Sequence, residues 1–253
     1  TLDPLPRDAT ERHIPSCVQD SIMHVVFDLD GVLLDSESDL SWLDRALDRT
    51  LAEFDLPQTD ENRRKIYPAN VPDFTEAARS FGVDAEELWR TRDDFYTDEK
   101  LDAIERSDLR PFDDVNRLYD FREESDLEHN LHVLSNSPEV VVETFVRTYD
   151  FEDLFEITIG RGHALEDLDD LKPSTEPFDR LRHRLGNRGD DPRFEYVYVG
   201  DTDSDREFAD RVGMKYLHLD RHGTDEDPDA ERTMDGVCTR LRDHAGDDPS
   251  DGE

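Results

Sequence analysis

Polar residues with the chemistry of phosphate and metal sites follow several apolar runs of the sequence. They are Asp28 and Asp30 after HVVF, Ser135 and Asn136 after HVL, Lys172 within DDLKPSTEP, and Asp201 and Asp205 after YVYVG. Carboxylates bind hard divalent cations such as Mg²⁺, while a hydroxyl or an ammonium group binds phosphate oxygens. A carboxylate beside such a cation can attack phosphorus and form an aspartyl phosphate. A charge that directly ends an apolar strand is costly without a partner, which points to a function for Asp28 and Asp30.

The apolar runs themselves predict the strands that position these residues. The sequence contains strand-like segments at 23–27, 131–135, 155–160, 195–200 and 215–220. After residue 111, these segments alternate with segments of helical spacing. Such alternation predicts an α/β fold, a Rossmann-like parallel sheet sandwiched by helices. Ligands of open parallel sheets bind beyond the carboxyl ends of the strands. We therefore expect the polar residues to meet at one edge of the sheet.

A helical block separates the first strand from the rest of the predicted sheet. Leu40, Leu43, Leu47, Leu51 and Phe54 recur at three- and four-residue spacing, which predicts an amphipathic helix, and similar patterns continue to about residue 109. We predict a core domain of residues 22–35 and 110–245, with residues 36–109 inserted as a helical cap (the cap). Residues 1–21 are expected to be an extension, and 246–253 an acidic tail.

The charge of the chain limits its partners. The sequence has 66 acidic and 30 basic residues, a net charge of −36, which argues against nucleic acid and anionic membranes as partners. Only four of the basic residues are lysines, and acid spread along every helix resembles proteins of halophilic archaea. At about 1 M salt the Debye length is roughly 3 Å, which screens such self-repulsion. No apolar run is long enough to span a membrane, and the apparent lack of a signal segment predicts a cytoplasmic protein.

Four short motifs occur in an order that is typical of one superfamily. DLDGVLLDS (28–36), LSNS (134–137), KP (172–173) and GDTDSD (200–205) resemble the motifs of the haloacid dehalogenase superfamily in its phosphatase branch. The cap, inserted directly after the first motif, resembles that of phosphoglycolate phosphatase and β-phosphoglucomutase relatives. The resemblance covers roughly residues 22–220 and implies the Rossmann-like core.

The first and third motifs imply roles in catalysis. By the resemblance, Asp28 is the nucleophile and also a metal ligand. Asp30 would protonate the leaving alcohol and then activate water, and its main-chain carbonyl would bind the metal. Gly31 would allow a sharp turn under the phosphate. Lys172 would neutralise charge between the nucleophile and the phosphoryl group.

The other two motifs imply binding roles. Ser135 and the main-chain amide of Asn136 would bind phosphate oxygens. Asp201 would bind Mg²⁺ directly, and Asp205 directly or through water. Asp203 is equally within reach by sequence, so the identity of the second acid of this motif stays open.

The resulting expectation is a Mg²⁺-dependent phosphomonoester hydrolase that acts on a small phosphorylated metabolite. A phosphomutase uses the same motifs and is the main alternative, because the difference lies in cap residues that the motifs do not identify. A dehalogenase needs no proton for its leaving group, so the acid at Asp30 argues against it. A non-catalytic metal-binding or partner-binding module is a further alternative, although no motif is interrupted.

Overall fold

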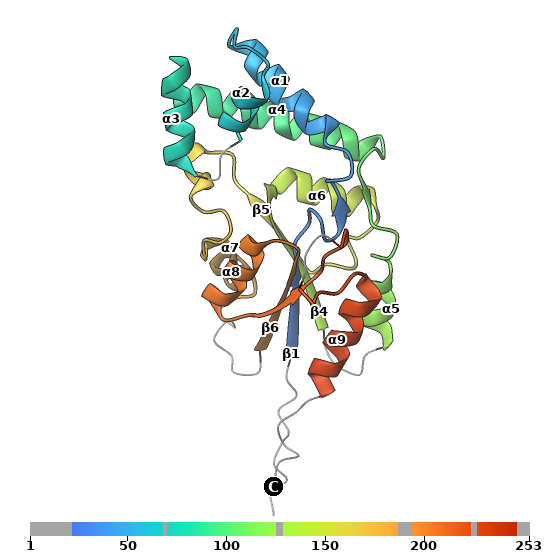
Figure 1. Ribbon diagram of the computed structural model, residues 1–253. Coiled ribbons are helices and arrows are strands. Elements are labelled where there is room, and N and C mark those ends of the chain that lie inside the picture. The colour runs from blue at the N-terminus through green and yellow to red at the C-terminus, as the bar shows by residue number, and fades with distance from the viewer. Residues whose placement is uncertain (1–21, 68–69, 125–128, 187–193, 224–226, 247–253) are drawn as a thin grey trace, which may run out of the picture.

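The computed structural model describes residues 22–67, 70–124, 129–186, 194–223 and 227–246. The predicted extension and all but the first residue of the acidic tail lie outside these ranges. Five parallel strands form the central sheet: β1 (Ile22–Phe27), β4 (His129–Pro138), β5 (Ile157–Arg161), β6 (Phe194–Gly200) and β7 (Lys215–His218). Their order is β5-β4-β1-β6-β7, and Figure 1 shows them below the cap. The predicted α/β fold is confirmed.

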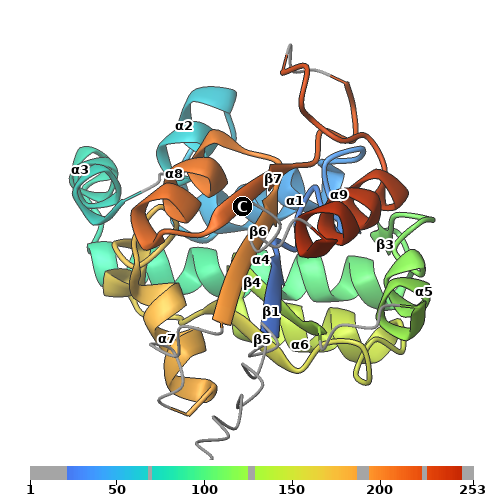
Figure 2. The same ribbon diagram turned by 90° about the horizontal axis from the view of Figure 1, so that it is seen from below.

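Helices cover both faces of this sheet (Figure 2). Along β1, Val25 and Phe27 pack in a cluster with α5 (Arg117–Glu124), α6 (Glu139–Thr148) and α9 (Met234–Gly246). Val26 points to the opposite face and packs with α7 (Glu176–Arg184) and α8 (Asp203–Val212). Because successive side chains of a strand alternate between faces, an unbroken apolar run is what a strand buried on both faces requires.

The cap lies beyond the carboxyl edge of the sheet (Figure 1). Its helices are α1 (Ser41–Glu53), α2 (Asp60–Lys65), α3 (Val71–Phe81) and α4 (Ala85–Glu105). They are flanked by two short strands, β2 (Leu34–Asp35) and β3 (Arg110–Pro111), which pair antiparallel. The chain therefore leaves and re-enters the core through adjacent strands.

Two helices are hard to delimit from the sequence. Helix α4 continues to Glu105, within the helical block that the sequence predicts to about residue 109. Its second half carries many charges that obscure the apolar stripe. The run DAERTMDGVCTRLRDH predicts a last helix over 229–244, but α9 begins at Met234. The hydroxyl of Thr233 accepts a hydrogen bond from Gly236 N and caps the first turn.

Contacts between the cap and the core join the two across the pocket. Leu165 and Leu168, in the 3-10 helix η1 (Leu165–Leu168), pack in one apolar cluster with Leu51 and Phe74 of the cap. The indole nitrogen of Trp89 donates to the carbonyl of His163 at 2.8 Å. None of the described helices is long and apolar enough to cross a membrane.

Candidate active site

Asp28 lies directly after β1, at the carboxyl edge of the sheet. Its main-chain N–H donates to Val199 O of the neighbouring strand at 2.9 Å, which continues the sheet pairing to this residue. Its Oδ1 accepts hydrogen bonds from Leu29 N at 2.7 Å and is 2.9 Å from Lys172 Nζ. Burial raises the pKa of Asp28 to about 7, against the opposing effect of the Lys172 charge.

Lys172 is buried at the centre of this edge. Its ammonium group is 2.6 Å from Asp205 Oδ1 and 2.6 Å from the hydroxyl of Tyr198. Its main-chain N–H donates to Asn136 Oδ1 at 2.9 Å, so the Asn136 side chain positions the Lys172 loop. Burial opposes the charged form, but the charges of Asp205 and Asp28 outweigh it and raise the Lys172 pKa. The lysine therefore stays charged between two carboxylates.

Three carboxylates converge next to Lys172. One oxygen from each of Asp28, Asp201 and Asp205 lies within 4.8 Å of the others. Burial, and then the negative charge of Asp28, raise the pKa of Asp201 to about 8. The Oδ1 atom of Asp201 is buried and has no hydrogen-bond partner among the described residues. These three carboxylates fit a hard divalent cation, which would bind Asp201 Oδ1 and offset the repulsion between the negative charges.

Gly31 lies against the same group of carboxylates. Its φ of +74° is in the left-handed region, where a side chain is strained. A Cβ at this position would lie 2.0 Å from Asp201 Oδ2. The close approach of the main chain to Asp201 therefore requires glycine on both grounds.

The structure brings Asp205, and not Asp203, next to Asp28. Asp203 is exposed at the start of α8, whereas Asp205 is buried. Thr202 precedes the helix, and its hydroxyl donates to Asp205 Oδ2 at 2.7 Å in a capping box. Lys172 holds the other carboxylate oxygen of Asp205. Both oxygens are thus oriented, and the charge of Lys172 in particular lowers the Asp205 pKa although burial opposes it.

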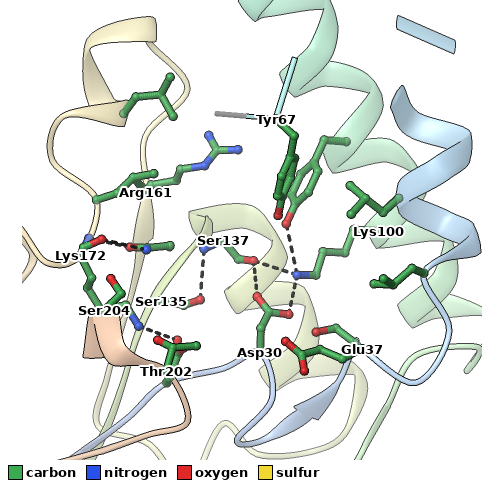
Figure 3. A pocket seen from close by; sticks show the side chains of 18 of the residues that line it. Asp30, Glu37, Tyr67, Lys100, Ser135, Ser137, Arg161, Lys172, Thr202 and Ser204 are labelled. Atoms are coloured by element: carbon green, nitrogen blue, oxygen red, sulfur yellow. Dashed lines mark hydrogen bonds and ion pairs between the residues drawn. The ribbon is translucent and has the colours of Figure 1, made fainter. Parts of the chain in front are cut away.

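Asp30 is engaged by the cap. Lys100 of α4 places its Nζ 2.6 Å from Asp30 Oδ1, and Ser137 donates its hydroxyl to Oδ2 at 2.7 Å (Figure 3). Lys100 also donates to Ser137 Oγ at 2.8 Å, which closes a three-membered network. Burial opposes ionisation of Asp30, but the charge and hydrogen bond of Lys100 lower its pKa. Asp30 is therefore ionised in this arrangement.

A cavity of about 440 Å³ connects these groups. Five of the predicted site residues besides Asp28 line it: Asp30, Ser135, Asn136, Lys172 and Asp205. Asp201 and Gly31 lie next to Asp28, outside the lining set. The Ser135 hydroxyl accepts from Ser137 N at 3.1 Å, which orients it near the carboxyl end of β4. The site residues predicted from four separate motifs therefore lie together.

The comparison with protein families agrees with this arrangement. The model for haloacid dehalogenase-like hydrolases matches residues 25–219, most of the chain. The chain belongs to this family. As a haloacid dehalogenase-like hydrolase it is an enzyme, and the matched range contains all of the predicted site residues. A comparison with curated proteins gave no significant match.

Solved structures share the fold of this hydrolase. A predicted phosphatase from Clostridium acetobutylicum is 18% identical, with a TM-score of 0.59, 87% of this chain covered and 98% of that chain. A predicted phosphoglycolate phosphatase from Haemophilus somnus is 20% identical, with a TM-score of 0.54 and coverages of 81% and 87%. A 2-haloacid dehalogenase from Pseudomonas syringae is 23% identical, with a TM-score of 0.56 and coverages of 88% and 100%. At these identities the likeness shows the fold alone.

Several site residues of the hydrolase were not predicted from the sequence. Lys100, Arg92, Arg161 and Tyr198 all lie in helical or strand segments whose patterns predict only packing. The scarcity of lysine is a signal for Lys100, since it is one of only four in an arginine-rich chain. The run GRG (160–162) after the predicted strand at 155–160 predicts a loop, but Arg161 ends β5 and points into the pocket (Figure 3).

Proposed function

We propose that this hydrolase is a Mg²⁺-dependent phosphatase that acts on a small organic phosphate through an aspartyl phosphate. The observation that carries the proposal is the grouping of Asp28, Asp201 and Asp205 around Lys172 at the pocket. Three carboxylates that can bind a cation, together with the buried Lys172 ammonium between Asp28 and Asp205, suit the transfer of a dianionic phosphoryl group. Two of the structures that share this fold are described as predicted phosphatases, the reaction class proposed here.

Asp28 is the proposed nucleophile. Its Oδ1 is held by Leu29 N and Lys172, so Oδ2 is the oxygen without a bond to the described residues and the one we assign to attack. That oxygen forms a bond to phosphorus while the ester P–O bond breaks. The leaving alkoxide takes a proton from Asp30, which has to take up a proton before this step because its pairing with Lys100 favours the ionised form. Lys172 stays charged and stabilises the negative charge of the phosphoryl oxygens.

Asp30 is the proposed acid and base. After the first transfer it is a carboxylate and accepts a proton from a water molecule that attacks the phosphorus atom. The bond between phosphorus and Asp28 then breaks, inorganic phosphate leaves, and Asp30 is protonated for the next cycle. The pairing with Lys100 favours the ionised form, the state that this second half-reaction needs.

Binding roles are proposed for the remaining residues. Asp28, Asp201 and Asp205 would hold Mg²⁺ together with the main-chain carbonyl of Asp30. The bound cation would neutralise charge on the phosphoryl group. Ser135 Oγ and the main-chain N–H of Asn136 would bind phosphate oxygens.

The experiment that tests this function is a panel of phosphorylated metabolites assayed for phosphate release in molar KCl. We expect turnover with Mg²⁺, none with excess EDTA, and recovery when Mg²⁺ is restored. Full turnover in EDTA would overturn the metal role. Isomerisation of a sugar phosphate without net phosphate release would replace the hydrolase by a phosphomutase. We also infer a salt-rich cytoplasm as the working environment, from the net charge of −36.

A further inference from the structure

Arg92 occupies the cap side of the pocket, away from the reacting carboxylates. Arg92, Tyr96 and Lys100 recur at four-residue spacing on α4, so they form one stripe along the helix, and all three line the cavity. Lys100 marks the end of this stripe that contacts Asp30. Eight residues of helix separate it from Arg92, a rise of about 12 Å. Arg92 therefore faces a different part of a bound molecule.

The charge of Arg92 is poorly compensated. The side chain is buried, with 5% of the residue exposed, and its Nε has no hydrogen-bond partner among the described residues. Its ion pair with Asp93 is long, at 3.6 Å. Asp93 is already engaged by Arg161 through Oδ1 and by His163 Nδ1, which lies 2.9 Å from Oδ2. One carboxylate thus serves two guanidinium groups, whereas Lys100 and Lys172 each have close carboxylate partners.

Aromatic rings hold Arg92 in place without using its donors. Its guanidinium carbon lies 4.6 Å from the ring centre of Tyr96, 5.0 Å from Tyr67 and 5.2 Å from Trp89. Contacts with ring faces stabilise the cation but leave its N–H groups available for hydrogen bonds. A buried cation with unused donors in a pocket wall is suited to an anion, since charge-assisted pairs are strong in a site of low dielectric.

We propose that Arg92 binds a second anionic group, a carboxylate or a phosphate, on the phosphate ester that is hydrolysed at Asp28. The inference rests on the proposed function and makes it more specific, because it names substrates with two anionic ends. The planar guanidinium presents paired N–H groups that match the two oxygens of such a group. Neutral alcohol esters would leave this cation with only the distant carboxylate of Asp93, which it shares with Arg161, and the pocket would discriminate against them.

Non-hydrolysable phosphonates test binding independently of turnover. Titration calorimetry of the full chain with Mg²⁺ would compare 3-phosphonopropionate and 4-phosphonobutyrate with propylphosphonate and butylphosphonate. We expect the acid of at least one pair to bind about tenfold to hundredfold more tightly, as for a charge-assisted hydrogen bond. Propane-1,3-bisphosphonate in place of the carboxylates distinguishes a second phosphate from a carboxylate as the preferred anion.

Substitution of Arg92 decides which residue causes the preference. Arg92→Gln is expected to reduce the ratio of the two affinities to near one. Arg90→Gln is the matched control, since it removes the same charge from an exposed position of α4 and should leave the ratio unchanged. Arg92→Lys keeps the charge without the planar fork and should retain part of the preference, and it replaces Arg92→Gln if that variant does not fold.

The outcomes separate the two proposals. Equal affinities in the wild type for both pairs, together with no tighter binding of propane-1,3-bisphosphonate, would overturn the role of Arg92. A preference that survives Arg92→Gln would also overturn it. Turnover of propyl phosphate is measured separately. If propyl phosphate and its carboxylate-bearing analogue are both left intact, the hydrolase proposal fails. If both esters are hydrolysed with equal kcat/KM, the hydrolase proposal stands and only the proposed anion site at Arg92 is wrong.

Discussion

The two sides of the pocket differ in charge and in how they are held. The sheet edge supplies carboxylates, with Asp28, Asp201 and Asp205 grouped around Lys172. The cap supplies cations and rings, with Lys100 and Arg92 among Trp42, Tyr67, Trp89 and Tyr96. An acidic floor suits a metal and a phosphoryl group, whereas a cationic wall suits the rest of an anionic molecule. Under the proposed function, the core would carry out the chemistry and the cap would select the substrate.

The two buried lysines show the same contrast. Among the described residues, Lys172 is held by core residues alone, including Tyr198 on β6 and the Asn136 side chain. Lys100 comes from the cap and reaches the core through Asp30 and Ser137. The Lys172 contacts therefore form with the sheet, while those of Lys100 require the cap to lie against it. The ionisation of Asp30 should therefore depend on whether the cap lies against the core.

The largest expected effect follows removal of the nucleophile on the core side. Asp28→Asn should lower kcat by about 10³-fold or more while the fold is retained, because the amide cannot form the phospho-enzyme. Phosphate release measures kcat, and circular dichroism measures whether the fold is retained. Asp44→Asn, at an exposed position on α1, is the control for loss of one charge. Normal turnover in Asp28→Asn would contradict the assignment.

A smaller effect is expected for the cap lysine. Lys100→Met should lower kcat about tenfold to hundredfold and shift the acid limb of its pH profile to higher pH, because Asp30 loses the cation that lowers its pKa. Lys65→Met removes an exposed cap lysine that pairs with Glu61 and serves as the control. If Lys100→Met has the same pH profile of kcat as Lys65→Met and the wild type, Lys100 does not lower the pKa of Asp30.

The carboxylate group should also affect stability in the metal-free protein. Folding raises the pKa of Asp28 to about 7 and that of Asp201 to about 8, above the usual 3.8. The native state then binds protons that the unfolded chain releases, so the free energy of unfolding should fall as pH rises from about 4 to about 8. The expected decline is on the order of a few kcal/mol. Urea denaturation across this range measures it.

Variants and metal make that stability test specific. Asp201→Asn should flatten the decline, and Asp203→Asn, an exposed position two residues away, should not. Saturating Mg²⁺ should reverse the trend, because the cation binds the ionised carboxylates. A decline that is unchanged in Asp201→Asn would show that folding does not raise the pKa of Asp201.

The smallest expected effect concerns salt. With a net charge of −36, surface repulsion should be screened as KCl rises from about 0.1 to about 2 M, and the melting temperature should increase by several degrees. The buried ion pairs of the pocket are screened far less. Lys100→Met should therefore show the same salt slope as the wild type. A higher melting temperature in salt-free buffer would contradict a halophilic origin.

Much of the architecture could be predicted because it depends on local patterns. The run HVVF before Asp28 and the run YVYVG before Asp201 predict strands, and parallel strands bring their carboxyl ends to one edge. The boundaries of α4 and α9 were less predictable. Dense charge hides the apolar stripe of α4, and the start of α9 depends on a single hydroxyl cap.

The sequence by itself determined the α/β core, the helical nature of the cap and the set of acids with Lys172 that meet at the sheet edge. Tertiary structure alone decided that Asp205 rather than Asp203 faces Asp28. It also decided that Lys100 contacts Asp30 across 70 residues of sequence, and that Arg92 shares its counter-ion with Arg161. The reason is physical. A strand end follows from neighbouring residues, but the partner of a buried charge depends on how the cap packs against the core.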